Sequence, residues 1–230
     1  MNFKFMRKFL FILLIIIPGL YAFSQETKVI SDLRFIGELG LEKSLFHNWK
    51  VGAEAALKLE KNISRIDEMD LDLNIGYSPL KFLDLTVGYR LANNHKNNNT
   101  YEKKYRYFGE IKLDQDIRRF NFEYRLRYQN IDDDFFQQEL NQPSKNILRN
   151  RIQFSYNIRK LPFEPFTSLE LCGLLDSHEN FMSKIKFILG AKYNLKQFGK
   201  LKIYYRIDRE LNASYPYMYY NLGISYSYNF

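Results

Sequence analysis

The feature that most constrains this chain is a strict alternation of apolar and polar residues, clearest over residues 217–230 (YMYYNLGISYSYNF). Counting back from Phe230, the large apolar residues include Tyr228, Tyr226 and Ile224, and the residues between them are small or polar. A period of two over this length predicts a β-strand with one apolar and one polar face, longer than most strands of soluble domains. Such a strand is typical of a membrane β-barrel. A soluble β-sandwich that ends on a strand is the alternative.

The same alternation recurs from Leu33 onward as runs of about ten residues separated by breaks. The clearest run covers residues 120–129, and Pro162 and Pro165 are expected to bound a later turn. Eleven runs can be counted, whereas a bacterial single-chain barrel has an even number of strands. We therefore predict an all-β, antiparallel transmembrane β-barrel of twelve strands, with a short additional strand over Gln25–Ile30. Ten strands is the alternative.

Residues 1–24 have the order of a secretory signal peptide, with basic residues, then an apolar run over 9–17, then Ala22–Ser24. The basic residues are Lys4, Arg7 and Lys8. The apolar run is too short to span a bilayer as a helix. We expect the mature chain to begin near Gln25 and residues 25–230 to form one barrel, with no room for a plug or a second domain.

The C-terminal residues Tyr226, Tyr228 and Phe230 resemble the signal by which the barrel-assembly machinery of Gram-negative bacteria recognises its clients. We therefore expect the chain in the outer membrane, in contact with lipid and lipopolysaccharide. The formal net charge of +8 is spread through the strands, so no nucleic-acid partner is expected. No cofactor site is apparent, and the single Cys172 excludes an intramolecular disulfide.

The polar faces of the runs carry 15 basic and 14 acidic residues, a near balance. The acids are concentrated in the first four runs and the bases in the later ones, so an acidic wall is expected to face a basic wall across the lumen. The residues predicted to line the lumen as its principal charges are Glu54, Asp70, Asp72, Arg90, Arg106, Arg125, Arg127, Arg149 and Arg151.

This charge arrangement leaves open what the barrel does. If the charges pair across the lumen, they fill a narrow structural barrel, which is the favoured interpretation because single buried charges are costly. If water separates them, the barrel is a small porin. A lipid acyl-hydrolase is a second alternative, but His47, His95 and His178 lie in expected turns and loops and no G-x-S-x-G is present. No enzyme activity and no metal site are therefore expected.

Several segments resemble a family of uncharacterised outer-membrane barrels common in the Bacteroidota, known as domain of unknown function 2490. The most specific are Val87–Arg90 (VGYR), Tyr124–Asn130 (YRLRYQN) and Leu148–Asn150 (LRN). The resemblance covers nearly the whole mature chain. It implies a barrel fold and an outer-membrane location, and it implies no activity, cofactor or catalytic residue.

Overall fold

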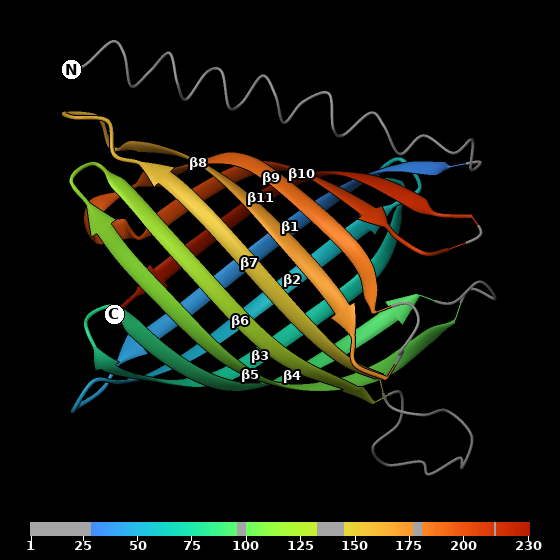
Figure 1. The fold of residues 1–230 in the computed structure, drawn as a ribbon, viewed down its shortest axis with the longest axis horizontal. Helices are drawn as coiled ribbons and strands as arrows, with labels where there is room; N and C mark the ends of the chain where they lie inside the picture. The colour runs from blue at the N-terminus through green and yellow to red at the C-terminus, as the bar shows by residue number, and fades with distance from the viewer. Residues whose placement is uncertain (1–28, 96–99, 133–144, 177–180, 214) are drawn as a thin grey trace.

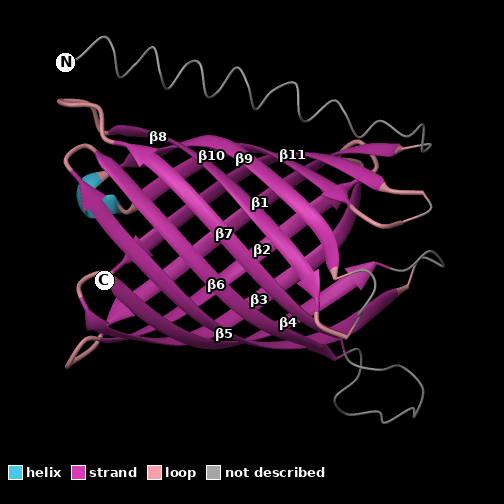
Figure 2. Ribbon diagram, viewed as in Figure 1, coloured by secondary structure: helices cyan, strands magenta, loops and turns pink. Residues whose placement is uncertain are grey.

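The protein is described from a computed structural model, which covers residues 29–95, 100–132, 145–176, 181–213 and 215–230. Within these residues the chain forms a closed β-barrel of eleven strands (Figure 1). The strands are β1 (Ile30–Ser44), β2 (Trp49–Glu60), β3 (Arg65–Leu80), β4 (Leu83–His95), β5 (Tyr101–Ile117), β6 (Phe120–Asp132), β7 (Lys145–Tyr156), β8 (Phe163–Leu174), β9 (Met182–Asn194), β10 (Lys200–Glu210) and β11 (Tyr217–Asn229). One short 3-10 helix, η1 (Lys196–Phe198), connects β9 to β10 among the described residues (Figure 2).

The barrel closes between its first and last strands, and this pair is parallel. Each strand from β1 to β11 pairs antiparallel with the next, whereas Ile30 to Glu42 of β1 pair in parallel register with Tyr217 to Asn229 of β11. The predictions of twelve and of ten strands are therefore wrong. An even number is required only if the closing pair is antiparallel, and a parallel pair closes a barrel with an odd number of strands. Of the segment expected to form a twelfth strand, residues 25–28 lie outside the described residues, and Ile30 already belongs to β1.

The connections divide the cylinder into two ends. The turn end carries the connections 45–48, 81–82, 118–119, 157–162 and 195–199, together with the end of β11. The loop end carries the connection 61–64, the ends of β4, β6, β8 and β10, and the starts of β1, β5, β7, β9 and β11. In Figure 1 the turn end is on the left and the loop end on the right.

One short turn at the loop end is held by a side chain from a neighbouring strand. Lys61, Asn62 and Ile63 all have positive φ angles, of 51°, 54° and 68°. The carboxylate of Asp32 on β1 accepts hydrogen bonds from the backbone N–H groups of Lys61 (3.0 Å) and Asn62 (2.9 Å). These two bonds fix a left-handed backbone that an isoleucine disfavours.

Of the two prolines expected to bound a turn, Pro162 lies in the connection before β8, whereas Pro165 does not interrupt its strand. Pro165 lies inside β8, opposite Ala191 of β9, and β8 begins at Phe163. Pro79 lies within β3, where the register with β4 shifts between Tyr77 and Leu80. Both strands are therefore longer than the alternation of apolar residues indicated.

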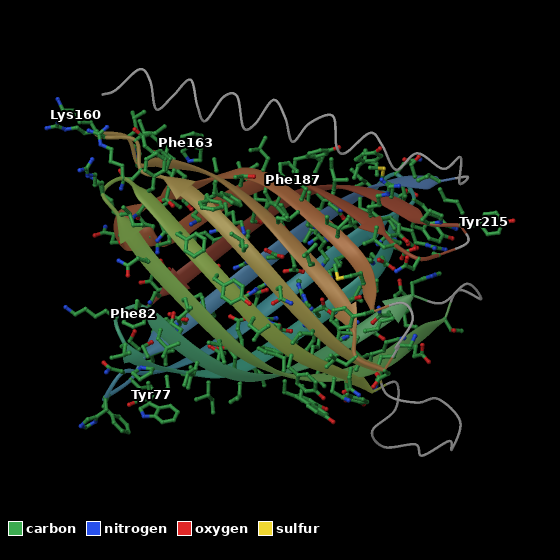
Figure 3. All side chains as sticks on the ribbon, in the orientation of Figure 1. Tyr77, Phe82, Lys160, Phe163, Phe187 and Tyr215 are labelled. Atoms are coloured by element: carbon green, nitrogen blue, oxygen red, sulfur yellow. The ribbon has the colours of Figure 1, made fainter. Side chains whose placement is uncertain are left out.

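The barrel is polar inside and apolar outside. Its most exposed side chains include Leu39 (64% exposed) and Val87 (63%), whereas Glu170 is 2% exposed and Asn221 is 1% exposed. Exposed aromatic residues lie at both ends, among them Phe82 and Phe163 at the turn end and Tyr215 at the loop end (Figure 3). Among the described residues, no helix has the length and apolar character needed to cross a bilayer.

Candidate functional site

The candidate site is the lumen, which the inward-facing side chains of all eleven strands line. One cavity of about 890 Å³ occupies it. Its lining includes Arg34, Lys145 and Glu210 near the loop end and Lys50 and Lys112 near the turn end. The cavity therefore extends along most of the cylinder. Its volume lies within the range of ordinary small-molecule pockets.

The structure places all nine predicted lumen charges on the lining of this cavity. They are Glu54, Asp70, Asp72, Arg90, Arg106, Arg125, Arg127, Arg149 and Arg151. Alternation brings them there, because residues two apart on a strand face the same side of the sheet. Among the described residues, the geometry adds an ion-pair partner for each of these charges except Glu54.

On the β2–β5 side, acids of β3 bind bases of β2 and β4. The guanidinium group of Arg90 binds Asp72 through two hydrogen bonds of 2.5 and 2.6 Å and lies 3.3 Å from Asp70. The ammonium group of Lys58 contacts Glu68 at 2.7 Å and Asp70 at 2.9 Å. Each pair joins adjacent strands, so the charges neutralise one another along the wall.

On the β6–β9 side, one carboxylate serves three bases. Glu170 of β8 receives Arg125 at 2.6 Å, Arg149 at 2.7 Å and Lys186 at 2.9 Å. Glu110 of β5 accepts a 2.6 Å hydrogen bond from Nε of Arg127. The bases of this wall are therefore held by a few acids that lie among them.

This pairing differs from the expected one across the lumen. Arg125, Arg127 and Arg149 were expected to reach Glu54, Asp70 or Asp72 on the opposite wall, but they bind Glu110 and Glu170 instead. A partner one or two strands away can be reached without spanning the lumen, so local pairing leaves the axis free. The alternation placed Glu110 and Glu170 on the inner face of the basic wall, but it did not predict that they bind the arginines of that same wall.

An apolar cluster inside the lumen was also missed. Phe166, Ile188 and Tyr204 pack together on the inner face of β8, β9 and β10. The ring of Tyr204 lies over Gly223 of β11, where an added Cβ atom would overlap it. The signal that could have located this cluster is an aromatic residue on a polar face with a glycine on the neighbouring strand.

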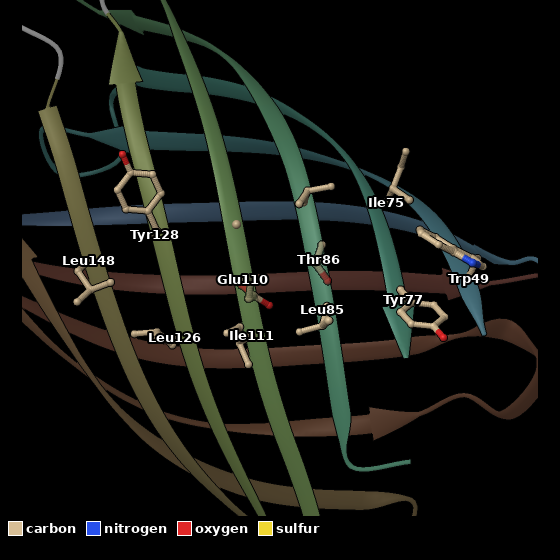
Figure 4. Close-up of a pocket in the computed structure, with 12 residues that line it drawn as sticks. Trp49, Ile75, Tyr77, Leu85, Thr86, Glu110, Ile111, Leu126, Tyr128 and Leu148 are labelled. Atoms are coloured by element: carbon tan, nitrogen blue, oxygen red, sulfur yellow. The ribbon is translucent and has the colours of Figure 1, made fainter. Parts of the chain in front are cut away.

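A second hollow, of about 520 Å³, lies on the outer surface of the barrel (Figure 4). It is lined by outward-facing apolar side chains of β2 to β7, and Gly109 leaves it open because no atom lies within 4 Å of the position of a Cβ atom there. At one edge Trp49 packs against Tyr77 with 4.9 Å between ring centroids. Its apolar side chains project from the face of the strands opposite the lumen, and Thr86 and Glu110 belong to the lining of both hollows.

Comparison with known proteins identifies the family of this chain. The model of a family of proteins of unknown function, DUF2490, matches residues 35–219. The chain belongs to this family. Among solved structures, the NanC porin is similar with a TM-score of 0.48 and 15% sequence identity, over 81% of this chain and 90% of that chain. No curated protein matches.

The residues expected to signal assembly lie at the turn end of this family member. The hydroxyl group of Tyr226 donates a 2.5 Å hydrogen bond to the carbonyl oxygen of Phe198. The rings of Tyr228 and Phe230 stack with 6.1 Å between centroids. The three side chains therefore form part of the aromatic rim, and their role in assembly stays a prediction.

The residues considered for catalysis are not brought together. His47 packs edge-on against Phe46 in the turn after β1, and His95 packs edge-on against Tyr101 at the loop end. His178 lies outside the described residues. Within the described ranges, no group of three or more His, Cys, Asp or Glu residues is arranged to hold a metal ion.

Proposed function

We propose that the protein is a narrow channel of the bacterial outer membrane through which small charged solutes cross. The observation that carries this proposal is the lumen cavity, whose lining reaches from Arg34 at the loop end to Lys50 at the turn end. Most of the lining side chains are charged or polar. A polar conduit of this size favours ions and small polar molecules over lipids.

The inverted polarity of the barrel supports the membrane location. Apolar side chains such as Leu39 and Val87 would cost free energy in water, whereas a bilayer accommodates them. Aromatic residues at both rims match the interfacial girdles of outer-membrane barrels. We accordingly place outer-membrane lipid and lipopolysaccharide around the apolar band, with the turn end in the periplasm and the loop end outside.

The pairing pattern favours an open lumen over the filled structural barrel. A filled barrel requires long side chains that meet across the axis, whereas Arg149 of β7 and Arg125 of β6 both bind Glu170 of β8, one and two strands away. Charges that neutralise one another along the wall leave water along the axis. They also reduce the net field, so we expect weak discrimination between anions and cations.

The experiment that tests the proposal uses two adjacent alanines of β2. Ala56 lines the cavity, whereas Ala55 faces outward opposite Leu39. The purified full chain is inserted into planar bilayers in potassium chloride, and single-channel conductance is compared between wild type, Ala56→Trp and Ala55→Trp. Folding of each variant is checked from the difference in gel mobility between unheated and boiled samples.

We expect discrete conductance steps from the wild type and from Ala55→Trp, and smaller or absent steps from Ala56→Trp. A folded wild type that carries no current would contradict the channel and support the filled barrel. Equal conductance of the two tryptophan variants would show that current does not pass through this lumen.

A further inference from the structure

Three charged side chains of the lumen form no ion pair among the described residues, and they lie near one another. They are Glu38 of β1, Glu54 of β2 and Lys202 of β10, and all three line the cavity. Lys202 and Glu38 occupy one hydrogen-bonded row, with Ser225 of β11 between them. The unpaired charges therefore gather around the parallel β1·β11 junction, whereas the other lumen charges away from the rims are paired.

Small residues leave space beside these charges. Ala56 and Ser225 both lie opposite Glu38 and line the cavity. Gly40 lies opposite Glu54, and the nearest side-chain atom to the position of a Cβ atom there is 3.6 Å away. Small residues therefore flank these charges, and an added Cβ atom at Gly40 would make only ordinary van der Waals contacts.

Aromatic rings hold the lysine and one carboxylate in position. The ammonium group of Lys202 lies 4.9 Å from the ring centroid of Phe166 and 5.0 Å from that of Tyr204. The hydroxyl group of Tyr204 donates a 3.3 Å hydrogen bond to Glu38. The base and the acid are therefore arranged before any solute arrives, which lowers the ordering cost of binding.

The third charge, Glu54, is exposed to the cavity and has an acidic neighbour. It lies directly opposite Asp72 of β3, and Asp72 is itself bound by Arg90. Arg90 already binds Asp72, so a cation that enters the lumen is left to bind Glu54, and it also weakens the repulsion between like charges in directly opposite positions. Glu54 is therefore the group of this set with most to gain from a cationic ligand.

We propose that Glu38, Glu54 and Lys202 form a binding site for a solute that carries two ammonium groups and one carboxylate, as a basic amino acid does. This inference rests on the proposed channel function and names the solute class. Two carboxylates match two ammonium groups, and the ammonium group of Lys202 matches the carboxylate. A solute of this class can enter the narrow lumen because charged and polar side chains of the wall replace the water molecules that hydrate it.

Three related probes separate the contributions of the groups. L-Lysine carries the full set, L-norleucine lacks the second ammonium group, and 1,5-diaminopentane lacks the carboxylate. Each is added to the wild-type channel in potassium chloride, and the concentration that halves the ion current is measured. We expect L-lysine to halve the current at a concentration about tenfold below that needed of L-norleucine or of 1,5-diaminopentane. A tenfold difference corresponds to about 1.4 kcal/mol.

Two variants assign the effect to the site. Glu54→Gln should weaken the action of L-lysine about tenfold, because it removes one ammonium partner and keeps the side-chain volume. Lys202→Met should abolish the preference for L-lysine over 1,5-diaminopentane, because it removes the carboxylate partner. Lys160→Met, in the exposed turn between β7 and β8, is the control and should leave all values unchanged.

Equal action of the three probes on a conducting wild type would overturn the site and leave the channel standing. So would an unchanged preference in folded Lys202→Met. If the folded wild type carries no current, the channel function fails, and binding is then measured on the protein in micelles by saturation-transfer NMR of the same probes. Saturation of L-lysine that is lost in Glu54→Gln would support the site without a channel, and absence of saturation would overturn it.

Discussion

Arg127 of β6 lies directly opposite Arg149 of β7 on the inner face of the barrel. Two further inward-facing pairs repeat this relationship, Arg125 with Arg151 and Arg90 with Arg106. Like charges in such positions cost roughly 0.2–1 kcal/mol per pair relative to neutral residues. The arginine pairs are therefore tolerated only because acids on the flanking strands bind them, and the lumen depends on those acids for its stability.

The first prediction tests this dependence at Glu110, which pairs with both Arg125 and Arg127. Glu110→Gln should lower the free energy of unfolding by about 3 kcal/mol, because it leaves two enclosed guanidinium groups without their shared acid. Glu54→Gln is the matched control, since Glu54 forms no ion pair and faces Asp72. It should be neutral or slightly stabilising. Urea unfolding in lipid vesicles measures the stability of both variants. Equal losses would show that the arginines do not depend on Glu110.

The second prediction concerns the contact between Tyr204 and Gly223. Gly223→Ala should destabilise the barrel by about 1–3 kcal/mol, because the added methyl group overlaps the Tyr204 ring. Gly109→Ala, where the space is open, should change stability little. In a Tyr204→Ala background the cost of Gly223→Ala should disappear, and a cost that persists there would show that the ring is not its cause.

The third prediction concerns the strained turn between β2 and β3. Ile63 has a φ angle of 68°, which costs a β-branched residue about 1–2 kcal/mol. Ile63→Gly should therefore raise the free energy of unfolding, by about 1 kcal/mol. Ser64→Gly is the control, because Ser64 donates a 2.6 Å hydrogen bond to the carbonyl oxygen of Lys61 and should lose stability when replaced. A destabilised Ile63→Gly variant would refute the strain.

The fourth prediction is a pH dependence at the loop end. The side-chain amide and then the backbone N–H of Asn146 donate hydrogen bonds to Asp176, at 2.9 and 2.6 Å. They hold the pKa of Asp176 below its ordinary value of 3.8. A lowered folded-state pKa means that this carboxylate contributes stability above pH 3.8 and loses the contribution as the pH falls through the folded value.

Hydrogen exchange of the Asn146 amide, corrected for its intrinsic rate, measures this contact. Protection should be constant from neutral pH down to about pH 4 and should decrease at lower pH. Asp176→Asn should show less protection throughout and no such decrease. Identical profiles for the two proteins would mean that Asp176 does not hold this amide.

The sequence predicted the strands and their faces well, because alternation with a period of two indicates on which side of the sheet each residue lies. The run over residues 120–129 became β6, Phe120–Asp132, with Arg125 and Arg127 facing inward as expected. Strand count was not predictable in the same way. Alternation carries no information on strand direction, so the parallel pairing of β1 with β11 cannot be inferred from it.

The contents of the lumen were only partly predictable. Face assignments located Glu110 and Glu170 on the inside, but which arginine each would bind depends on neighbours two strands away in register. The inward aromatic residues Phe108 and Tyr204 were missed because the alternation considers each strand by itself, without its neighbours. Their space comes from Gly88 and Gly223 on the adjacent strands, which only a strand-pairing register relates to them.

Because the β1·β11 pair is parallel, the first strand begins at one rim of the barrel and the last strand ends at the other. Because β1 and β11 run in the same direction, Ile30 lies at one rim and Asn229 at the other. In a bilayer, an even-stranded barrel would present both ends of its strand sequence to the same compartment, whereas here each compartment receives one. A protease or antibody applied from a single side of the membrane would therefore reach an epitope fused at one end of the strand sequence and spare an epitope fused at the other.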